Sequence, residues 1–407
     1  MLDQREYFGD FWIPSNDSTQ TTHKMRGRLK VVEGESVLLE LSEVVGLKFL
    51  MKQNTINVLW GDIFGDISIT LFCISFHQLA GKGIVSLSVK YALYGCHVFS
   101  LDTPAFNECE VKYPYLHHWA STKRLLFQQE NDSNHIFIDN TNILSPLVKT
   151  ELENGLQAMI CENILTRISS YKIAVEQSSF LKFETNQNVS FKCFHELIIE
   201  FTQFIAIAQY FQQYPTEIYL NANGEKVQVL FSVEHSDQPH PHSLIQFSEL
   251  KNKIPEMMRR WHSNYTQVSP ICRYLIQTIH YNTFDFPDFL IVAHALEGYH
   301  KRFLNKKNGG KDKQKYKEQV DILLDKFKDV EVIKKSNIDT EVLTQSRDKY
   351  SHLIPDEEKP LAASGQELYY LTLKCKILLT CCILDLLGLN IEEINMCWQK
   401  FIKLFDF

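Results

Sequence analysis

QELYYLTLKCKILLTCCILDLL, residues 366–387, is the stretch that decides the fold of this chain. Apolar side chains would occupy most faces of a helix formed by this segment, and Gly388 follows it as a helix stop. A helix that is apolar on most faces lies inside a protein, so the segment predicts the centre of a helical bundle. Cys381 and Cys382 lie in the same apolar run and are expected to be core residues.

The chain around this segment has helical periodicity from residue 247 onward. Several of the expected helices have Pro in the first turn, where its missing N–H costs nothing. The further expected helices are residues 255–267, 270–282, 287–304, 313–327, 339–350 and 391–405. Residues 250–407 are therefore predicted to form an all-α bundle.

The N-terminal part, residues 1–245, has the short β-prone runs that are typical of antiparallel strands. The expected strands lie within residues 27–41, 57–64, 67–76, 84–93, 98–101, 135–138, 171–175, 180–183, 217–220 and 227–233. Asn223-Gly224 predicts a tight hairpin, and one long helix is expected over residues 194–213. The prediction is an α+β, multidomain protein whose β-rich region is a curved antiparallel sheet or a sandwich with one packed helix. A split near residue 150 would divide that region into two subdomains.

Composition limits the classes of function. The 407 residues suit two or three domains, and a net charge of −7 requires any contact with nucleic acid to be local. The ten cysteines have no metal-binding or redox spacing, so we expect no metal, no cofactor and a reducing compartment. The charged start lacks the pattern of a signal peptide, and no run is apolar enough for a membrane helix. A soluble, cytoplasmic protein is expected.

The stretch RDKYSH, residues 347–352, places an Arg and a His five positions apart near the end of an expected helix. Such a pair can cleave RNA without a metal. His352 can move a proton at the ribose 2′-OH or at the leaving oxygen, and Arg347 can stabilise the charge on the phosphate. Residues five apart in a continuous helix point about 140° away from each other. We therefore expect the helix to unwind near Ser351, with Pro355 helping to end it.

Spacing alone is weak support, because chance supplies roughly one such pair in a chain of this composition. Arg273 and His280 also match, but the mostly apolar residues between them predict the middle of a buried helix. A reactive pair must reach solvent and a phosphate, and the polar stretch 347–352 suits that requirement better.

Three segments together resemble one protein family. FPDFLIVAHALEGYHKRF, residues 286–303, is similar to the Glu-bearing helix of ApeA-type HEPN domains, and a bundle with Arg-x(4)-His near a helix end looks like a HEPN domain. YFGDFWIP, residues 7–14, resembles the start of the ApeA N-terminal domain, with GRL at 27–29 and LLEL at 38–41 following it. The resemblance thus includes both halves of the chain.

This resemblance implies a bacterial antiphage protein that acts by abortive infection. It implies a metal-independent RNA endonuclease, with residues 250–407 as the HEPN ribonuclease domain. Residues 1–245 would then sense a phage-derived protein or ligand, or restrain the nuclease. Catalytic Arg347 and His352 would face their counterparts across a homodimer, or within a higher homo-oligomer. The products would be a 2′,3′-cyclic phosphate and a 5′-OH, and transfer RNA is one candidate target.

Two acidic residues are candidates for supporting roles. Asp348 follows Arg347 directly, where the family often has a polar residue. Glu297 lies on the otherwise apolar helix of residues 286–303, where a buried carboxylate needs a partner, so it is expected to brace Arg347. The alternatives are an ordinary helix-end acid for Asp348 and an exposed pair with Lys301 for Glu297.

A cationic run between residues 301 and 317 could guide an RNA backbone toward the site. Its candidate RNA-binding residues are Lys306, Lys307, Lys311 and Lys313. Gly309-Gly310 within the run also suits a solvated loop, which is the alternative interpretation.

A second function class remains open for the whole chain. The HEPN module would bind RNA or a protein partner without catalysis. Arg347 would then pair with Asp348 or Glu358, and His352 would cap a helix end.

Overall fold

The structure of the chain is a computed structural model. It describes residues 4–15, 23–32, 37–42, 56–80, 84–121, 125–130, 133–138, 146–168, 173–234, 236, 242–280, 286–305 and 314–401. The chain forms two compact units. The first comprises Met1–Ile199 and Gln213–Ser236, and the second comprises Glu200–Gln212 and Asp237–Phe407.

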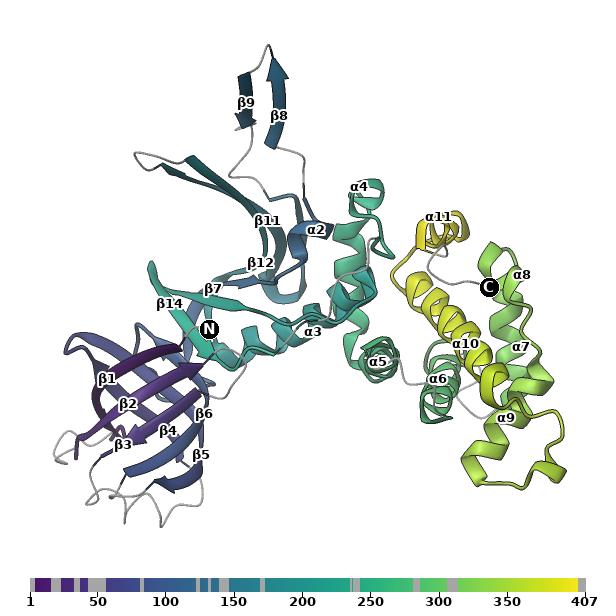
Figure 1. Cartoon of the computed structure of the whole chain (residues 1–407), viewed down its shortest axis with the longest axis horizontal. Helices are drawn as coiled ribbons and strands as arrows, with labels where there is room; N and C mark the ends of the chain where they lie inside the picture. Colours follow the sequence, from purple (N-terminus) through teal and green to yellow (C-terminus); the bar gives the residue numbers. More distant parts are fainter. Residues whose placement is uncertain are drawn as a thin grey trace. The chain divides into compact units, whose positions relative to one another are not determined.

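The first unit is built on a 12-stranded sheet whose strand pairs are antiparallel. Its N-terminal strands are β1 (Gln4–Trp12), β2 (Met25–Val32), β3 (Val37–Leu41), β4 (Ile56–Ile63), β5 (Ile67–Ala80) and β6 (Ile84–Tyr94). These strands follow the order β6-β3-β2-β1-β4-β5, and β5 also pairs with β6. The sheet therefore closes on itself as a barrel at this end (Figure 1).

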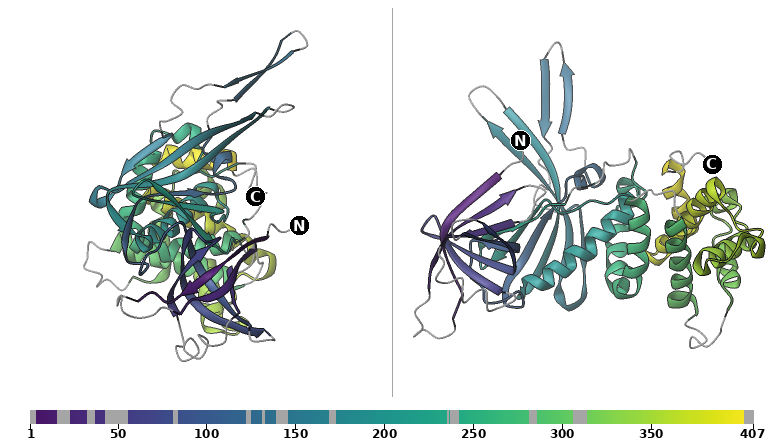
Figure 2. Two further views of the ribbon diagram at one scale, coloured as in Figure 1. Left: turned by 90° about the vertical axis from the view of Figure 1, so that its left-hand side faces the viewer. Right: turned by 60° about the horizontal axis from the view of Figure 1, so that its bottom comes forward.

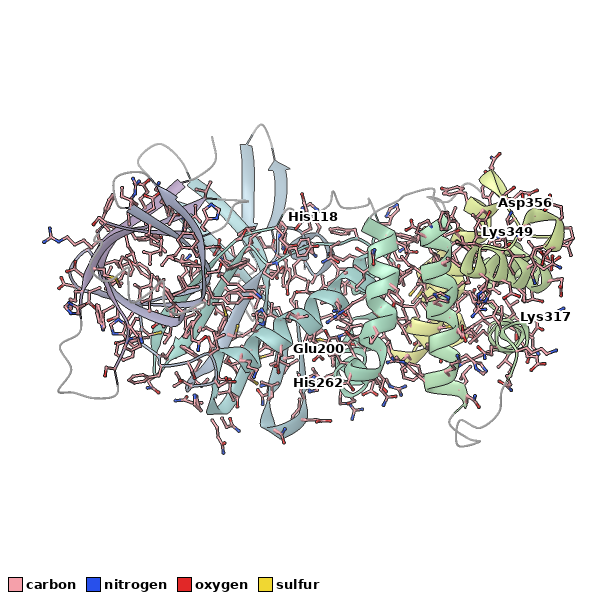
Figure 3. The ribbon with its side chains drawn as sticks, turned by 90° about the horizontal axis from the view of Figure 1, so that it is seen from below. His118, Glu200, His262, Lys317, Lys349 and Asp356 are labelled. Carbon is pink, nitrogen blue, oxygen red and sulfur yellow. The ribbon has the colours of Figure 1, made fainter. Side chains whose placement is uncertain are left out.

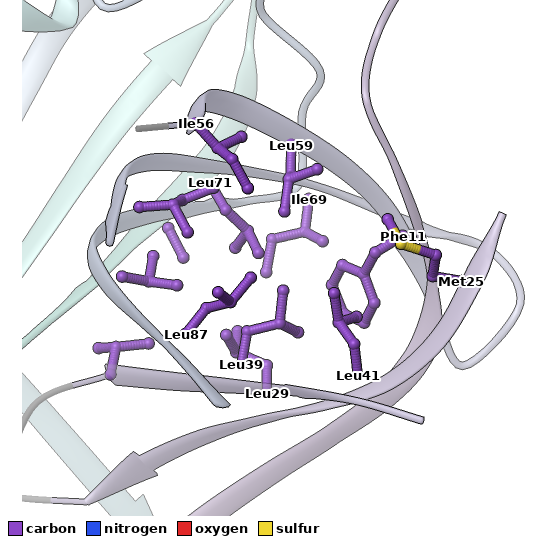
Figure 4. Close-up of a cluster of buried hydrophobic side chains, with 14 of the residues drawn as sticks. Phe11, Met25, Leu29, Leu39, Leu41, Ile56, Leu59, Ile69, Leu71 and Leu87 are labelled. Carbon is purple, nitrogen blue, oxygen red and sulfur yellow. The ribbon is translucent and has the colours of Figure 1, made fainter. Parts of the chain in front are cut away.

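Alternate residues of the barrel strands fill its interior. On β3, for example, Val37, Leu39 and Leu41 are fully buried. Figure 4 shows Leu39 and Leu41 among the side chains of the barrel interior. Phe11 of β1 points into the same cluster, and glycine leaves room for its ring. A Cβ added at Gly61 would lie 2.6 Å from Phe11 Cδ1, closer than side chains can approach. The barrel core therefore depends on glycine at this position of β4.

The rest of the sheet continues from β6 in the order β14-β13-β7-β12-β11-β10. These strands are β7 (Pro104–Lys112), β10 (Val148–Glu151), β11 (Gln157–Ile168), β12 (Ile173–Ser190), β13 (Glu217–Ala222) and β14 (Glu225–Phe231). The predicted hairpin joins β13 to β14, with left-handed Asn223 (φ 54°) and Gly224 (φ 93°). The first unit also contains the short helices α2 (Leu116–Trp119) and η1 (Glu153–Gly155), and a separate strand pair, β8 (Leu125–Glu130) and β9 (Ser133–Ile138). The long helix α3 (Phe191–Gln209) belongs to the first unit up to Ile199 and to the second unit from Glu200 onward.

The predicted α+β class is confirmed, and the curved antiparallel sheet is the observed β arrangement. Two strand predictions were wrong. Residues 98–101 form no strand, because Val98 is held as a buried loop residue. Its N–H donates to Thr70 Oγ1 (3.1 Å) and its carbonyl accepts from Trp60 Nε1 (2.9 Å). The described residues of the two strands expected at 171–175 and 180–183 instead belong to the single strand β12, whose partner β11 is equally continuous.

The second unit is helical. Its helices are α4 (Phe247–Leu250), α5 (Ile254–His280), α6 (Phe286–Tyr299), α7 (Tyr316–Lys326), α8 (Glu331–Ser336), α9 (Thr340–His352), α10 (Gly365–Leu386) and α11 (Ile391–Phe401). A π-helical turn, η2 (His300–Leu304), extends α6, and a 3₁₀ turn, η4 (Asp356–Glu358), follows α9. As predicted, α10 is central: it contacts α5, α6, α7, α8 and α11 (Figures 1 and 2). None of the described helices combines the length and the apolar character needed to cross a membrane.

The expected break between residues 267 and 270 was wrong, because α5 is one helix of 27 residues with Pro270 inside it. An internal Pro costs about 3 kcal/mol. The Pro270 ring is exposed, while apolar residues before and after it are fully buried, among them Trp261, Val268, Cys272 and Leu275. Burying these side chains outweighs the cost of the Pro.

One buried charge interrupts the apolar surface of α10. Lys376 is 6% exposed, and its Nζ donates a hydrogen bond to the carbonyl of Thr278 (2.8 Å). That carbonyl lies in the last turn of α5, where helical acceptors lack their usual donors. Burial lowers the pKa of Lys376 to about 8, although Asp288 opposes this effect.

We expect Lys376 to make stability depend on pH. Its folded pKa of about 8 lies below the ordinary 10.5. Between these values the unfolded chain binds more protons, so stability rises with pH. Relative to Lys376→Met, the wild-type free energy of unfolding should increase by about 2 kcal/mol from pH 7.5 to 9.5 in urea titrations.

Lys335→Met, at an exposed position on α8, is the matched control and should show no such change. A wild-type advantage that stays constant over this pH range would contradict the titration of Lys376.

Candidate functional site

α9 carries the Arg/His pair, and specific contacts fix its start and its inner side. Asp339 Oδ1 accepts hydrogen bonds from the backbone N–H groups of Glu341 (2.8 Å) and Val342 (3.2 Å). This N-cap satisfies two donors at the start of the helix. Further along, Leu343 and Ser346 are buried, so this side of α9 packs into the unit. Arg347 therefore starts from a well-anchored backbone.

The end of α9 differs from the sequence prediction. The helix does not unwind near Ser351 but continues through His352. It ends in one step at Leu353, whose left-handed conformation (φ 53°) caps it before Pro355 is reached. Because the helix is unbroken, Arg347 and His352 point about 140° apart. A single chain does not present the two side chains on one face of the helix.

The guanidinium of Arg347 is held on three sides. Its Nη2 pairs with Glu297 Oε2 of α6 (3.3 Å), and its Nη1 pairs with Asp348 Oδ1 (3.2 Å). Its Cζ lies 5.4 Å from the ring centroid of Tyr316 on α7, a cation–π contact. The Nε atom is buried, and no described residue accepts a hydrogen bond from it. Contacts from three helices thus fix the direction of this cation.

Two lysines flank the carboxylates that hold Arg347. Lys301 pairs with Glu297, and Lys359 pairs with Asp348 (3.2 Å). The result is an alternating series of charges, from Lys301 through Glu297, Arg347 and Asp348 to Lys359. Burial raises the pKa of Glu297, but its hydrogen bond to Lys301 and the charges of Lys301 and Arg347 outweigh burial and lower it. Glu297 is therefore a stable carboxylate at neutral pH.

Tyr316 supports Arg347 as a neutral platform. Its hydroxyl donates to the carbonyl of Ala293 on α6 (3.4 Å), and burial raises the pKa of Tyr316 well above its ordinary value. Its ring therefore stays uncharged beneath the guanidinium.

Two exposed histidines lie on the helices that meet at Arg347. His352 ends α9 beside Leu353, which is 80% exposed. His294 is on α6, one turn before Glu297. Neither imidazole has a hydrogen-bond partner among the described residues. Both remain available to a ligand from solvent.

Both predicted supporting residues, Glu297 and Asp348, contact Arg347, and the structure also contains the alternative pairing of Glu297 with Lys301. It does not bring His352 to the same side of α9. Four predicted RNA-binding residues lie outside the described part of the chain: Lys306, Lys307, Lys311 and Lys313.

Tyr316 and Lys359 were not predicted from the sequence to lie at this site. Each is a common residue type at an unremarkable spacing. The packing of α7 against α9 brings Tyr316 to Arg347, and the segment before α10 brings Lys359 to Asp348. No local sequence signal could have identified these contacts.

Other polar groups of the second unit have structural roles. Glu200 is buried and pairs with His262 Nδ1 (2.9 Å), which links the middle of α3 to α5 (Figure 3). Lys349 pairs with Asp356 (3.0 Å) across the turn after α9, and Lys317 pairs with Glu341. Over the described ranges, no group of three or more His, Cys, Asp or Glu side chains could hold a metal ion.

Comparison with protein families identifies both parts of the chain. The model of ApeA N-terminal domain 1 matches residues 6–261, more than half of the chain. The chain belongs to the ApeA family. A second model, the Apea-like HEPN domain, matches residues 290–393 of this ApeA-type chain. Comparison with curated proteins and with solved structures finds no match.

The two family matches confirm the predicted resemblance. ApeA and HEPN domains indicate antiphage defence, and HEPN domains are generally nucleases that bind RNA and often dimerise. The HEPN match spans α6 to the start of α11 and so includes Arg347, His352, Glu297 and Asp348.

Proposed function

We propose that this ApeA-type chain is a metal-independent endoribonuclease of antiphage defence. The observation that carries the proposal is the fixed Arg347, held by Glu297 and Asp348 on a helix that ends in an exposed His352. Phosphoryl transfer from RNA requires a pre-oriented cation and an available imidazole, and α9 carries one of each.

In this proposal, His352 moves a proton during attack of a ribose 2′-OH on the adjacent phosphorus. Arg347 stabilises the negative charge that accumulates on the phosphate oxygens. The products are a 2′,3′-cyclic phosphate and a 5′-OH. DNA is not cleaved, because it lacks the attacking hydroxyl.

The proposed active unit is a homodimer formed through the HEPN domain. Arg347 and His352 of one chain point about 140° apart around α9, so one phosphate cannot easily meet both. A second copy related by twofold symmetry can supply the missing side chain. This geometry supports a composite site, and higher homo-oligomers are compatible with it.

The proposed setting is the bacterial cytoplasm during phage infection. Residues 1–245 would recognise a phage-derived protein or ligand, and residues 250–407 would then cleave RNA and arrest growth. Transfer RNA is the proposed target, because its loss stops translation. The cationic run after η2 would guide the RNA backbone.

The test uses purified protein and total bacterial RNA in EDTA. We expect cleavage that produces cyclic-phosphate ends. The competing function is a HEPN module that binds RNA or protein without catalysis, and the pairing of Arg347 with Asp348 favours it. Binding without cleavage, also in the presence of a phage lysate, would support that alternative.

We expect Glu297→Gln to slow RNA cleavage roughly 10-fold, because Arg347 loses one of the two charges that orient it. Single-turnover rates on the same RNA measure the effect. Glu341→Gln is the matched control, since Glu341 forms an exposed ion pair with Lys317 (2.9 Å) at the start of α9. Equal rates for Glu297→Gln and wild type would remove Glu297 from the site.

A further inference from the structure

We infer that His294 is a second catalytic residue, the general base that takes the proton from the ribose 2′-OH. This inference rests on the proposed function, because it assigns a step of the same reaction. Cleavage through a 2′-OH needs a base for that hydroxyl and an acid for the leaving 5′ oxygen. The Arg/His pair supplies one imidazole per chain, which leaves one of the two roles open.

The position of His294 on α6 favours it. Residues three apart in a helix lie on the same side, so His294 and Glu297 share one side of α6. Glu297 contacts Arg347 directly (3.3 Å). The imidazole therefore lies on the Arg347 side of the site, whereas His352 points to another side of α9.

The surroundings of His294 favour an unprotonated imidazole. The charged and titratable groups near it are Arg347 of α9, Glu297 and Lys301 of α6, and Tyr316 of α7, which contacts both α6 and Arg347. Burial and the charge of Arg347 lower the pKa of His294, and Lys301 adds to this effect while Glu297 opposes it. A base must be free of its proton at neutral pH, and these groups favour that state.

Availability distinguishes His294 from the other polar side chains around Arg347. Glu297, Asp348, Lys301 and Lys359 are engaged in ion pairs with one another or with Arg347. His294 is exposed and has no hydrogen-bond partner among the described residues. It can accept a proton without first breaking a contact of the protein.

The reaction step follows from this arrangement. An imidazole nitrogen of His294 takes the 2′-OH proton while the 2′ oxygen bonds to phosphorus. The bond from phosphorus to O5′ breaks, and O5′ takes a proton from the imidazolium of His352 that the second chain of the proposed homodimer supplies. Arg347 stabilises the phosphate oxygens throughout. Exchange with solvent then removes the proton from His294 and protonates His352, which restores the starting state of both imidazoles.

The pH dependence of cleavage tests the assignment. The substrate is an oligoribonucleotide that spans a site mapped in total RNA. We expect His294→Gln to lose at least ~100-fold in rate, together with the rise of rate with pH on the acidic side. His242→Gln, at an exposed His elsewhere in the same unit, should cleave like wild type. A merely structural effect would lower the rate equally at all pH values and would overturn the inference.

A sulfur substitution separates base from acid. In an oligoribonucleotide whose bridging 5′ oxygen is sulfur, the leaving group needs no proton. We expect this substrate to restore cleavage by His352→Ala but not by His294→Gln. Equal rescue of both variants would overturn the role of His294 as base.

The two proposals fail in different ways. Loss of cleavage in His352→Ala with a wild-type pH profile in His294→Gln would overturn the role of His294 alone. Absence of cleavage by the wild-type protein, or full activity in His352→Ala, would overturn the proposed function and this inference with it.

Discussion

His352→Ala should lose nearly all RNA cleavage by the 407-residue protein in EDTA. A positioned imidazole that moves a proton in the transition state contributes roughly 10²–10⁴-fold to a rate, and the variant should lose a factor of that size. Growth arrest on expression should disappear as well. The fold should not change, because His352 is exposed at the last position of α9 and makes no hydrogen bond to any described residue.

His242→Ala and Leu353→Ala are the matched controls for this prediction. His242 is an exposed His of the same unit, and Leu353 is the exposed cap residue that directly follows His352. Both variants should retain cleavage. If His352→Ala cleaved RNA at the wild-type rate, the catalytic assignment of this residue would be wrong.

The sequence predicted the arrangement of elements better than it predicted where they end. The apolar face of residues 366–387 identified the central helix, because burial on most sides is a property of the segment itself. Because of Pro270, a helix break was predicted between residues 267 and 270. The free-energy cost of one Pro in a helix can be judged from the local sequence, but the burial that offsets it comes from packing against other helices. The closure of the barrel could not be predicted from the sequence either, because it depends on the long pairing between β5 and β6.

At the candidate site, the sequence identified the residues but not their directions. The expectation that the helix unwinds near Ser351 assumed that Arg347 and His352 must converge within one chain. Leu353 is not a residue type associated with left-handed caps, so its role could not be expected from the sequence. The contacts of Arg347 with Glu297 and Tyr316 come from helices distant in sequence, and only their packing reveals them.

Because α9 is unbroken, the proposed composite site can be tested by mixing two variants. Suppose that Arg347 of one chain acts with His352 of its partner. The variant Arg347→Ala then still carries His352, and the variant His352→Ala still carries Arg347. Arg347→Ala and His352→Ala should therefore complement each other when mixed. If both residues act within one chain, each chain of a mixed dimer carries one defect, and no mixture can be active.

We expect equal amounts of the two variants, unfolded and refolded together, to recover about a quarter of the wild-type cleavage rate. Random pairing makes about half of the dimers mixed, and each mixed dimer has one intact site out of two. Each variant alone should stay inactive, and a mixture of Arg347→Ala with the double variant should also stay inactive. Recovery in the first mixture alone requires exchange of catalytic residues between chains. An inactive first mixture, with mixed dimers verified by differential tagging, would show that Arg347 and His352 do not act across the interface.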